Sequence, residues 1–168
     1  VLKVGASVRC WWLVAMLVPL ASARAQSPGD RASLEAFRDS LGGAEDSLRL
    51  VALEQKLIAV AREDRNNAMH HLRLGFLSIR LGDLGSKSRY DDGAGEFEWA
   101  TELQPTWPWG WYGLGIAEDK VGDSQVSIVQ GLQAMFGKDH LSRAANAYAR
   151  SVQADPSFDR GLIELAST

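Results

Sequence analysis

Residues that commonly build catalytic and metal sites are scarce in this sequence. Among 168 residues there are three histidines. Two of them, His70 and His71, are adjacent, so on a helix they point about 100° apart and cannot chelate one ion together. Glycine-rich phosphate loops and the H-E-x-x-H, G-x-S-x-G and EF-hand patterns are missing. We therefore predict no metal, no cofactor and no catalytic residue, and we do not expect an enzyme.

An excess of basic residues is also missing. The chain has 18 Lys and Arg against 21 Asp and Glu, a formal net charge of −3, and the basic residues are scattered. Nucleic-acid binding needs a basic patch, so this class of partner is excluded. Because 46% hydrophobic and 23% charged residues is an ordinary globular composition, we expect a folded chain.

The N-terminal segment differs in composition from the rest. Lys3 and Arg9 precede an unbroken apolar run, Cys10–Leu20, and Ala23–Ala25 has the small-x-small pattern of a cleavage site. This order predicts a secretory signal peptide over residues 1–25. The run is shorter than the roughly 20 residues that span a bilayer, although an uncleaved membrane anchor is the alternative. We expect an exported protein, periplasmic or secreted, with no membrane span after cleavage.

Cleavage would change the composition of the mature chain. It would leave 18 − 3 = 15 basic residues against 21 acidic ones, and would remove Cys10, the only cysteine. An exported chain without a thiol cannot use disulfides or cysteine-bound zinc. Its stability would then depend on packing alone.

Two segments of the chain share one pattern of residues. A Leu-Gly pair is followed by an apolar-Gly-Asp turn, then by an aromatic residue and a proline. The first copy has Leu74-Gly75, Leu81-Gly82-Asp83, Phe97 and Pro105; the second has Trp111, Leu114-Gly115, Val121-Gly122-Asp123, Ala144, Tyr148 and Pro156. The pattern resembles the tetratricopeptide repeat, a helix–turn–helix unit of about 34 residues. The resemblance implies an all-α fold, a short α-solenoid of such repeats.

These residue types have physical reasons. A small residue at Gly75 and Gly115 lets the two helices of a repeat approach closely. We expect Gly82-Asp83 and the corresponding Gly122-Asp123 to end the first helix with a left-handed glycine cap. Pro105 should then end the second helix of its repeat.

The spacing predicts insertions. The glycine and the proline are 30 residues apart in the first copy (Gly75 to Pro105) and 41 in the second (Gly115 to Pro156), against about 24 in the family, so the insertions have 6 and 17 residues. A third copy begins in register, with Ala166 at the glycine position. Because that copy stops one turn later, we expect a longer protein.

The expected organisation follows from this register. After the signal peptide come a linker with N-terminal capping helices (26–66), repeat 1 with its 6-residue insertion (67–107), repeat 2 with its 17-residue helical insertion (108–158) and the start of repeat 3 (159–168). We place the capping helices after Asp30 as N-cap and at 44–63. The second should face a core with Leu48, Val51, Leu53, Leu57 and Val60.

The longer insertion, Ser124–Lys138, has apolar residues at near-helical spacing. We predict an extra inserted helix there, packed against the array or across its concave face. The 6-residue insertion is polar and predicts a longer loop.

In the family, the first helix of each repeat forms a concave binding face. The resemblance places there Met69, Leu72, Phe76, Ile79 and Arg80 of repeat 1, Trp109, Tyr112, Ile116, Asp119 and Lys120 of repeat 2, and Arg160 and Ile163 of the third copy. This groove is mainly apolar, which suits a hydrophobic helix or an extended peptide. Coverage of the groove by the inserted helix or by downstream repeats is the alternative.

The sequence therefore predicts an exported scaffold for protein–protein interaction through an apolar concave groove, with a protein or peptide partner. The alternative is a docking domain of a larger exported enzyme whose catalytic part lies beyond residue 168.

Overall fold

The computed structural model describes residues 26–126 and 133–167, so the predicted signal peptide lies outside the described residues. The described ranges contain seven α-helices and no strand: α1 (Pro28–Gly42), α2 (Ser47–Glu63), α3 (Ala68–Asp83), α4 (Arg89–Leu103), α5 (Pro108–Val126), α6 (Gln133–Ala154) and α7 (Asp159–Ser167). The predicted all-α class is confirmed. Within these ranges, no helix combines the length and apolar character needed to span a membrane.

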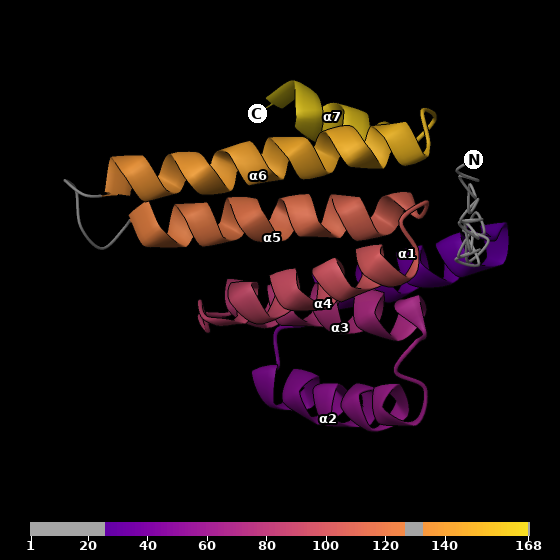
Figure 1. Ribbon diagram of the computed structural model, residues 1–168. Helices are drawn as coiled ribbons and strands as arrows, with labels where there is room; N and C mark the ends of the chain where they lie inside the picture. Colours follow the sequence, from indigo (N-terminus) through magenta and orange to yellow (C-terminus); the bar gives the residue numbers. More distant parts are fainter. Residues whose placement is uncertain (1–25, 127–132, 168) are drawn as a thin grey trace, which may run out of the picture.

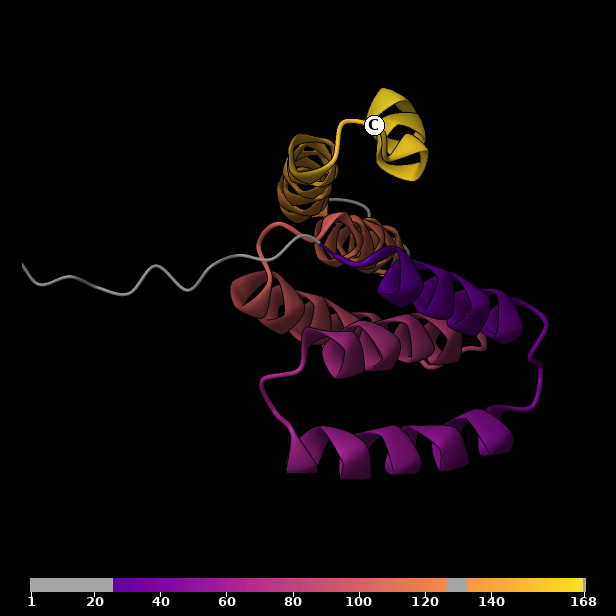
Figure 2. The ribbon, with the colours of Figure 1, turned by 90° about the vertical axis from the view of Figure 1, so that its right-hand side faces the viewer.

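The helices stack as a short α-solenoid (Figure 1). Helix α3 pairs with α4, and α5 pairs with α6, each as an antiparallel hairpin, and α7 packs against α6. In the view of Figure 2, α3, α5 and α7 lie toward one side of the stack, and α4 and α6 toward the other. We call these the concave and convex sides. Each hairpin buries its apolar stripe against the next, as expected of a repeat array.

Glycines allow the two helices of each hairpin to approach closely. A Cβ added at Gly75 would lie 2.7 Å from the ring of Phe97 in α4. At Gly115 it would overlap the ring of Tyr148 in α6. Both aromatic rings are almost wholly buried. The predicted role of Gly75 and Gly115 is therefore confirmed, and it fixes the same contact in both hairpins.

The predicted left-handed glycine caps are wrong. Among the described residues the only positive φ is at Gly85 (115°), after the end of α3. Gly82 instead lies inside α3, where its missing side chain admits the ring of Tyr90. Gly122-Asp123 lies inside α5, which continues to Val126. The first helix of each hairpin, α3 or α5, is therefore longer than predicted. Gly82 serves packing, and Gly122 is tolerated within a helix.

The second helices end where the prolines require. Helix α4 ends at Leu103 and α6 at Ala154, two residues before Pro105 and Pro156. Helix α1 begins earlier than predicted, because its N-cap is Ser27 rather than Asp30. The Ser27 hydroxyl accepts a hydrogen bond from the Asp30 amide at 3.1 Å.

The 17-residue insertion does not form a separate helix in the described residues. Its first residues, up to Val126, extend α5, and those from Gln133 onward begin α6. The apolar residues between them, 127–132, lie outside the described residues. The described parts of the insertion are therefore helical, and they lengthen the second hairpin.

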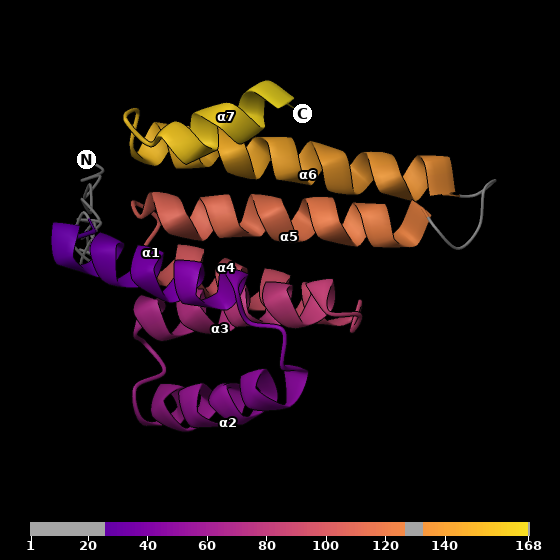
Figure 3. The same ribbon diagram turned by 180° about the vertical axis from the view of Figure 1, so that it is seen from behind.

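Helices α1 and α2 do not pack on each other as a capping pair. Each packs on α3 separately. Helix α1 lies on the concave side, in front of α3 and beside α5 in the view of Figure 3, whereas α2 lies at the end of the stack. The linker between them is held by Arg80, whose guanidinium donates to the carbonyl of Ala44 at 2.6 and 2.9 Å.

The face of α2 that packs inward differs from the predicted one. Leu50, Glu54 and Ala61 are buried, whereas Leu48 is 80% exposed. Leu53 and Leu57 are half-buried, as predicted, but Val51 and Val60 are exposed. Apolar residues surround much of this helix, so hydrophobic periodicity alone does not select a face.

One histidine links the α2–α3 turn to α4. His71 Nδ1 lies 2.7 Å from a carboxylate oxygen of Glu96, and Nε2 lies 2.8 Å from the carbonyl oxygen of Arg65. Carboxylate and carbonyl oxygens accept hydrogen bonds, so this geometry favours the imidazolium form of the ring, in which both nitrogens donate. Its ring stacks on Trp99 at a centroid distance of 4.7 Å. Burial lowers the pKa of His71, but the two hydrogen bonds and the Glu96 charge outweigh it and raise the pKa above 6.5.

This pair makes stability pH-dependent. A pKa that is raised on folding stabilises the protein below the unfolded pKa of 6.5, and that stabilisation is lost as the pH rises through the folded value. We expect the free energy of unfolding, measured in urea, to fall between pH 5.5 and 8.5 by more in the native protein than in His71→Gln. The neighbouring variant His70→Gln should keep the native pH dependence. Equal pH dependence in both variants would contradict the role of His71.

Candidate functional site

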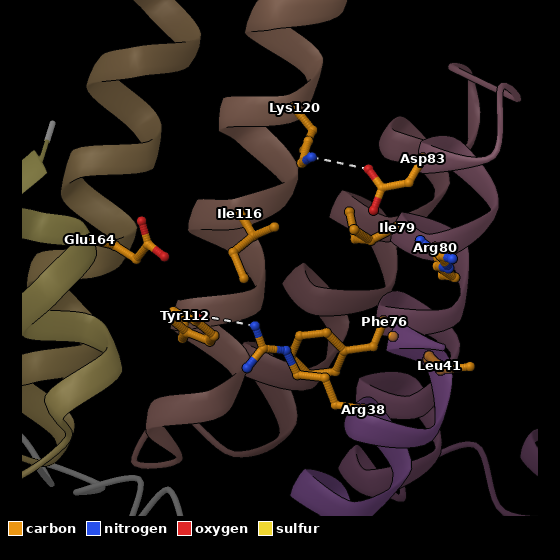
Figure 4. A pocket seen from close by; sticks show the side chains of 11 residues that line it. Arg38, Leu41, Phe76, Ile79, Arg80, Asp83, Tyr112, Ile116, Lys120 and Glu164 are labelled. Atoms are coloured by element: carbon orange, nitrogen blue, oxygen red, sulfur yellow. Dashed lines mark hydrogen bonds and ion pairs between the residues drawn. The ribbon is translucent and has the colours of Figure 1, made fainter. Parts of the chain in front are cut away.

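A pocket of about 320 Å³ remains on the concave side. Helices α1, α3, α5 and α7 all contribute to it (Figure 4). It is lined by Arg38, Leu41, Gly42, Phe76, Ile79, Arg80, Asp83, Tyr112, Ile116, Lys120 and Glu164. Its volume is within the range of ordinary ligand pockets and suits one or two side chains of a peptide.

A cluster of aromatic rings supports this pocket. The ring of Trp109 meets those of Phe76, Tyr112 and Phe158 edge to face, at centroid distances of 5.8, 5.6 and 5.1 Å. Trp109 has no exposed surface, and the other three are buried. Edge-to-face packing of this kind favours one fixed arrangement of the rings. The rings of Phe76 and Tyr112, which line the pocket, are therefore each packed against Trp109.

The guanidinium of Arg38 projects from α1 into the pocket (Figure 4). It lies 5.4 to 5.9 Å from the ring centroids of Tyr112, Phe76 and Trp109. Its one hydrogen bond to a described residue goes to the Tyr112 hydroxyl, at 3.3 Å, and it has no ion pair among them. Arginine carries five N–H donors, so most of them remain available to an acceptor in the pocket.

The other cations of the rim are already engaged. Lys120 Nζ of α5 forms an ion pair with Asp83 Oδ1 of α3 at 3.0 Å. Arg80 is bound to the Ala44 carbonyl. Glu164 of α7 faces the same pocket from the opposite wall (Figure 4). Arg38 is thus the cation of this pocket that has donors to spare.

The structure brings together six of the ten groove residues predicted in repeats 1 and 2. These are Phe76, Ile79, Arg80, Tyr112, Ile116 and Lys120, which all line the pocket. Met69 and Leu72 are instead buried in the core that α1 covers. Asp119 accepts a hydrogen bond from the Tyr148 hydroxyl at 2.6 Å. Burial raises the pKa of Asp119, although the hydrogen bond from Tyr148 opposes this.

Trp109 is the predicted groove residue whose placement differs most. It is enclosed by rings, and the guanidinium of Arg160 lies 5.6 Å from its centroid. The other predicted residue of the third copy, Ile163, is 68% exposed. The groove is therefore partly covered within the protein, by a helix that the sequence analysis had not named as a cover. The described part of the cover is α1.

Sequence reasoning missed the pocket residues that come from outside the first helices of the repeats. Arg38 and Leu41 belong to α1, and Asp83 lies at the end of α3. Glu164 was not selected in the third copy. An amphipathic N-terminal helix was visible in the sequence, but nothing in its pattern shows where that helix docks.

The chain has no match in the comparisons with known proteins. No family model, no curated protein and no solved structure matches it. Its class is therefore given by the fold alone, a short α-solenoid.

Proposed function

We propose that the protein is an exported, non-enzymatic scaffold of the tetratricopeptide-repeat type that binds a partner protein through the concave pocket. Two hairpins with the same glycine–aromatic contact, Gly75 with Phe97 and Gly115 with Tyr148, support the repeat type. The observation that carries the binding proposal is the guanidinium of Arg38, held in a pocket of apolar and charged side chains with most of its donors unused.

The pocket determines what kind of peptide fits. Ile79 and Ile116 offer apolar contact, and Tyr112 offers the edge of a ring. Arg38 offers N–H donors to a carbonyl or side-chain oxygen. A partner segment that places one apolar side chain beside one oxygen acceptor satisfies both, and burial of such an anchor gives most of the affinity of an interface.

Site-specific cross-linking tests this function. With p-benzoylphenylalanine in place of Ile116, we expect one defined partner to be cross-linked in the cell envelope of the source organism. The same group in place of Leu48, which is 80% exposed on α2, is the matched control and should not trap that partner.

The second arm uses the identified partner and purified protein. Arg38→Ala should weaken its binding about tenfold, because hydrogen bonds to a charged donor contribute roughly 1.5–3 kcal/mol. Helix content measured by circular dichroism should be unchanged, since alanine is a good helix former. Equal trapping from positions 116 and 48, or unchanged affinity of Arg38→Ala, would move the binding site away from the concave pocket.

A further inference from the structure

A second, larger cavity lies on the convex side of the first hairpin. It has a volume of about 580 Å³ and is formed between α2 and α4, with α3 as its floor. We call it the convex cavity. Its lining consists of Glu54, Ile58, Leu74, Ser78, Arg89, Asp91, Asp92, Gly95, Glu96 and Trp99.

One face of α4 forms a wall of this cavity. Asp92, Gly95, Glu96 and Trp99 follow each other at helical spacing and all line it. A Cβ added at Gly95 would meet nothing within 4 Å, so the wall is open at that point. Trp99 is 45% exposed, which is unusual for the largest apolar side chain. The cavity is therefore reachable from solvent.

The floor of the cavity holds a polar group without a partner. Ser78 of α3 is 3% exposed and lines the cavity. In the described part of the chain its hydroxyl has no hydrogen-bond partner, whereas other helical serines, such as Ser151, donate to a backbone carbonyl. Its Oγ opens onto the cavity rather than being enclosed by protein, so it can accept a hydrogen bond from a ligand that enters.

The second hairpin has a corresponding cavity of about 360 Å³, which its own arginine side chains line. The residues of α6 that match the α4 wall, counted from Phe97 and Tyr148, are Arg143, Asn146, Ala147 and Arg150, and all four line the second cavity. Arg150 lies 4.7 Å from the ring centroid of Trp111.

The floor of the second cavity is also satisfied from within the chain. Glu118 stands three residues after Gly115, as Ser78 stands three after Gly75. Its carboxylate lies 3.4 Å from Arg143 Nε and 2.6 Å from His140 Nδ1. In the second hairpin, therefore, the chain's own arginine reaches the floor position that Ser78 occupies in the first.

The charges of the two cavities differ accordingly. The second is lined by Glu98 and Glu118 against two arginines, which balances it. The convex cavity is lined by four carboxylates, of Glu54, Asp91, Asp92 and Glu96. Arg89 pairs with Glu54 and Asp92, His71 pairs with Glu96, and Asp91 has no ion pair among the described residues.

Arg89 is already engaged. It donates to both carboxylate oxygens of Glu54, at 2.8 and 3.2 Å, and to Asp92 at 3.3 Å. A neighbouring hollow holds Arg62 and Arg65, so the uncompensated negative charge lies at the Asp91 end of the cavity. Clefts lined by one sign of charge concentrate ligands of the other sign.

We propose that the convex cavity binds an arginine side chain of a partner protein, whose guanidinium reaches the floor as Arg143 does in the second hairpin. The aliphatic stem packs on Ile58 and Trp99, and the guanidinium donates to Ser78 Oγ and to the carboxylates beside it. Arginine suits this site because its planar fork donates to several acceptors at once and stacks on aromatic rings. This surface is separate from the concave pocket and does not depend on it.

Nuclear magnetic resonance with a small probe tests the proposal. The probe is the peptide acetyl-Gly-Arg-Gly-amide, titrated into the ¹⁵N-labelled protein at low salt, and the control peptide has neutral citrulline in place of arginine. We expect saturable shifts of the Trp99 indole N–H and the Gly95 amide with the arginine peptide, and binding at least about tenfold weaker with the citrulline peptide.

Two variants at one position separate occlusion from unfolding. Gly95→Leu should block the cavity and weaken arginine-peptide binding by at least about tenfold, whereas Gly95→Ala should bind as the native protein does. Asp91→Asn and Ser78→Ala should each weaken binding several-fold. The proposal is overturned if neither resonance shifts saturably, if the citrulline peptide binds equally well, or if a folded Gly95→Leu protein binds like the native one.

Discussion

Replacing Trp109 by alanine is expected to lower the free energy of unfolding by about 3–5 kcal/mol, the usual cost of removing a buried aromatic side chain. Trp109 has no exposed surface and joins three aromatic rings from α3, α5 and the α6–α7 turn. Its loss would leave a cavity that rigid neighbours cannot close. Since small domains are stable by only about 5–15 kcal/mol, this variant should be unfolded in a large fraction of molecules at 37 °C.

Trp111→Ala is the matched control for this result. Trp111 is two residues away on α5, but it is only half-buried, its indole N–H donates to the Pro105 carbonyl, and Arg150 covers its ring. We expect a loss of about 1–2 kcal/mol, from one hydrogen bond and one cation–π contact. Urea unfolding followed by circular dichroism measures both. A Trp109→Ala protein as stable as Trp111→Ala would show that the ring cluster is not a structural core.

The second large effect is expected at Gly115. Alanine normally stabilises a helix by roughly 0.5–1 kcal/mol relative to glycine. At Gly115 the added Cβ would overlap the ring of Tyr148, which is buried and bound to Asp119 through its hydroxyl at 2.6 Å. The ring cannot move without breaking that bond, so α5 and α6 must separate. We expect a net loss of about 1–3 kcal/mol for Gly115→Ala, and complete loss of folding for Gly115→Leu.

Gly95→Ala provides the comparison at a helix interior of the same array. Nothing lies within 4 Å of the added Cβ, so the ordinary helix preference should act alone and the variant should be about 0.5–1 kcal/mol more stable than the native protein. The midpoints of thermal and of urea unfolding should therefore both rise for Gly95→Ala and both fall for Gly115→Ala. A shift in the same direction would contradict the assignment of Gly115 to a helix–helix contact.

The sequence predicted the hairpins well because their signals are local. Leu-Gly pairs, aromatic residues in register and the two prolines each act within one helix or one turn, and the contacts of Gly75 with Phe97 and of Gly115 with Tyr148 follow from that register. The glycine caps were wrong because a glycine at a helix end and a glycine at a close contact look alike in a single sequence. Gly82 is the second kind, since it admits Tyr90.

The concave pocket was predicted only in part, because its cover is not local. The register of the repeats correctly predicted that Phe76, Tyr112 and Ile116 line the pocket. It could not give Arg38, because docking of α1 depends on contacts made far along the chain. One of these is the ion pair of Arg31 with Asp155, at 2.5 Å. For the same reason the sequence did not show that Trp109 is enclosed.

The separate attachment of α1 and α2 to α3 has a consequence for how the molecule opens. Because the two helices share no interface, detachment of either one breaks its own contacts with the array and leaves the other seated. Their backbone amides should therefore exchange with solvent deuterium in two independent cooperative units, each below the global opening energy. Helices α1 and α2 should thus detach from α3 independently of each other. Detachment of α1 alone should expose the ring cluster around Trp109.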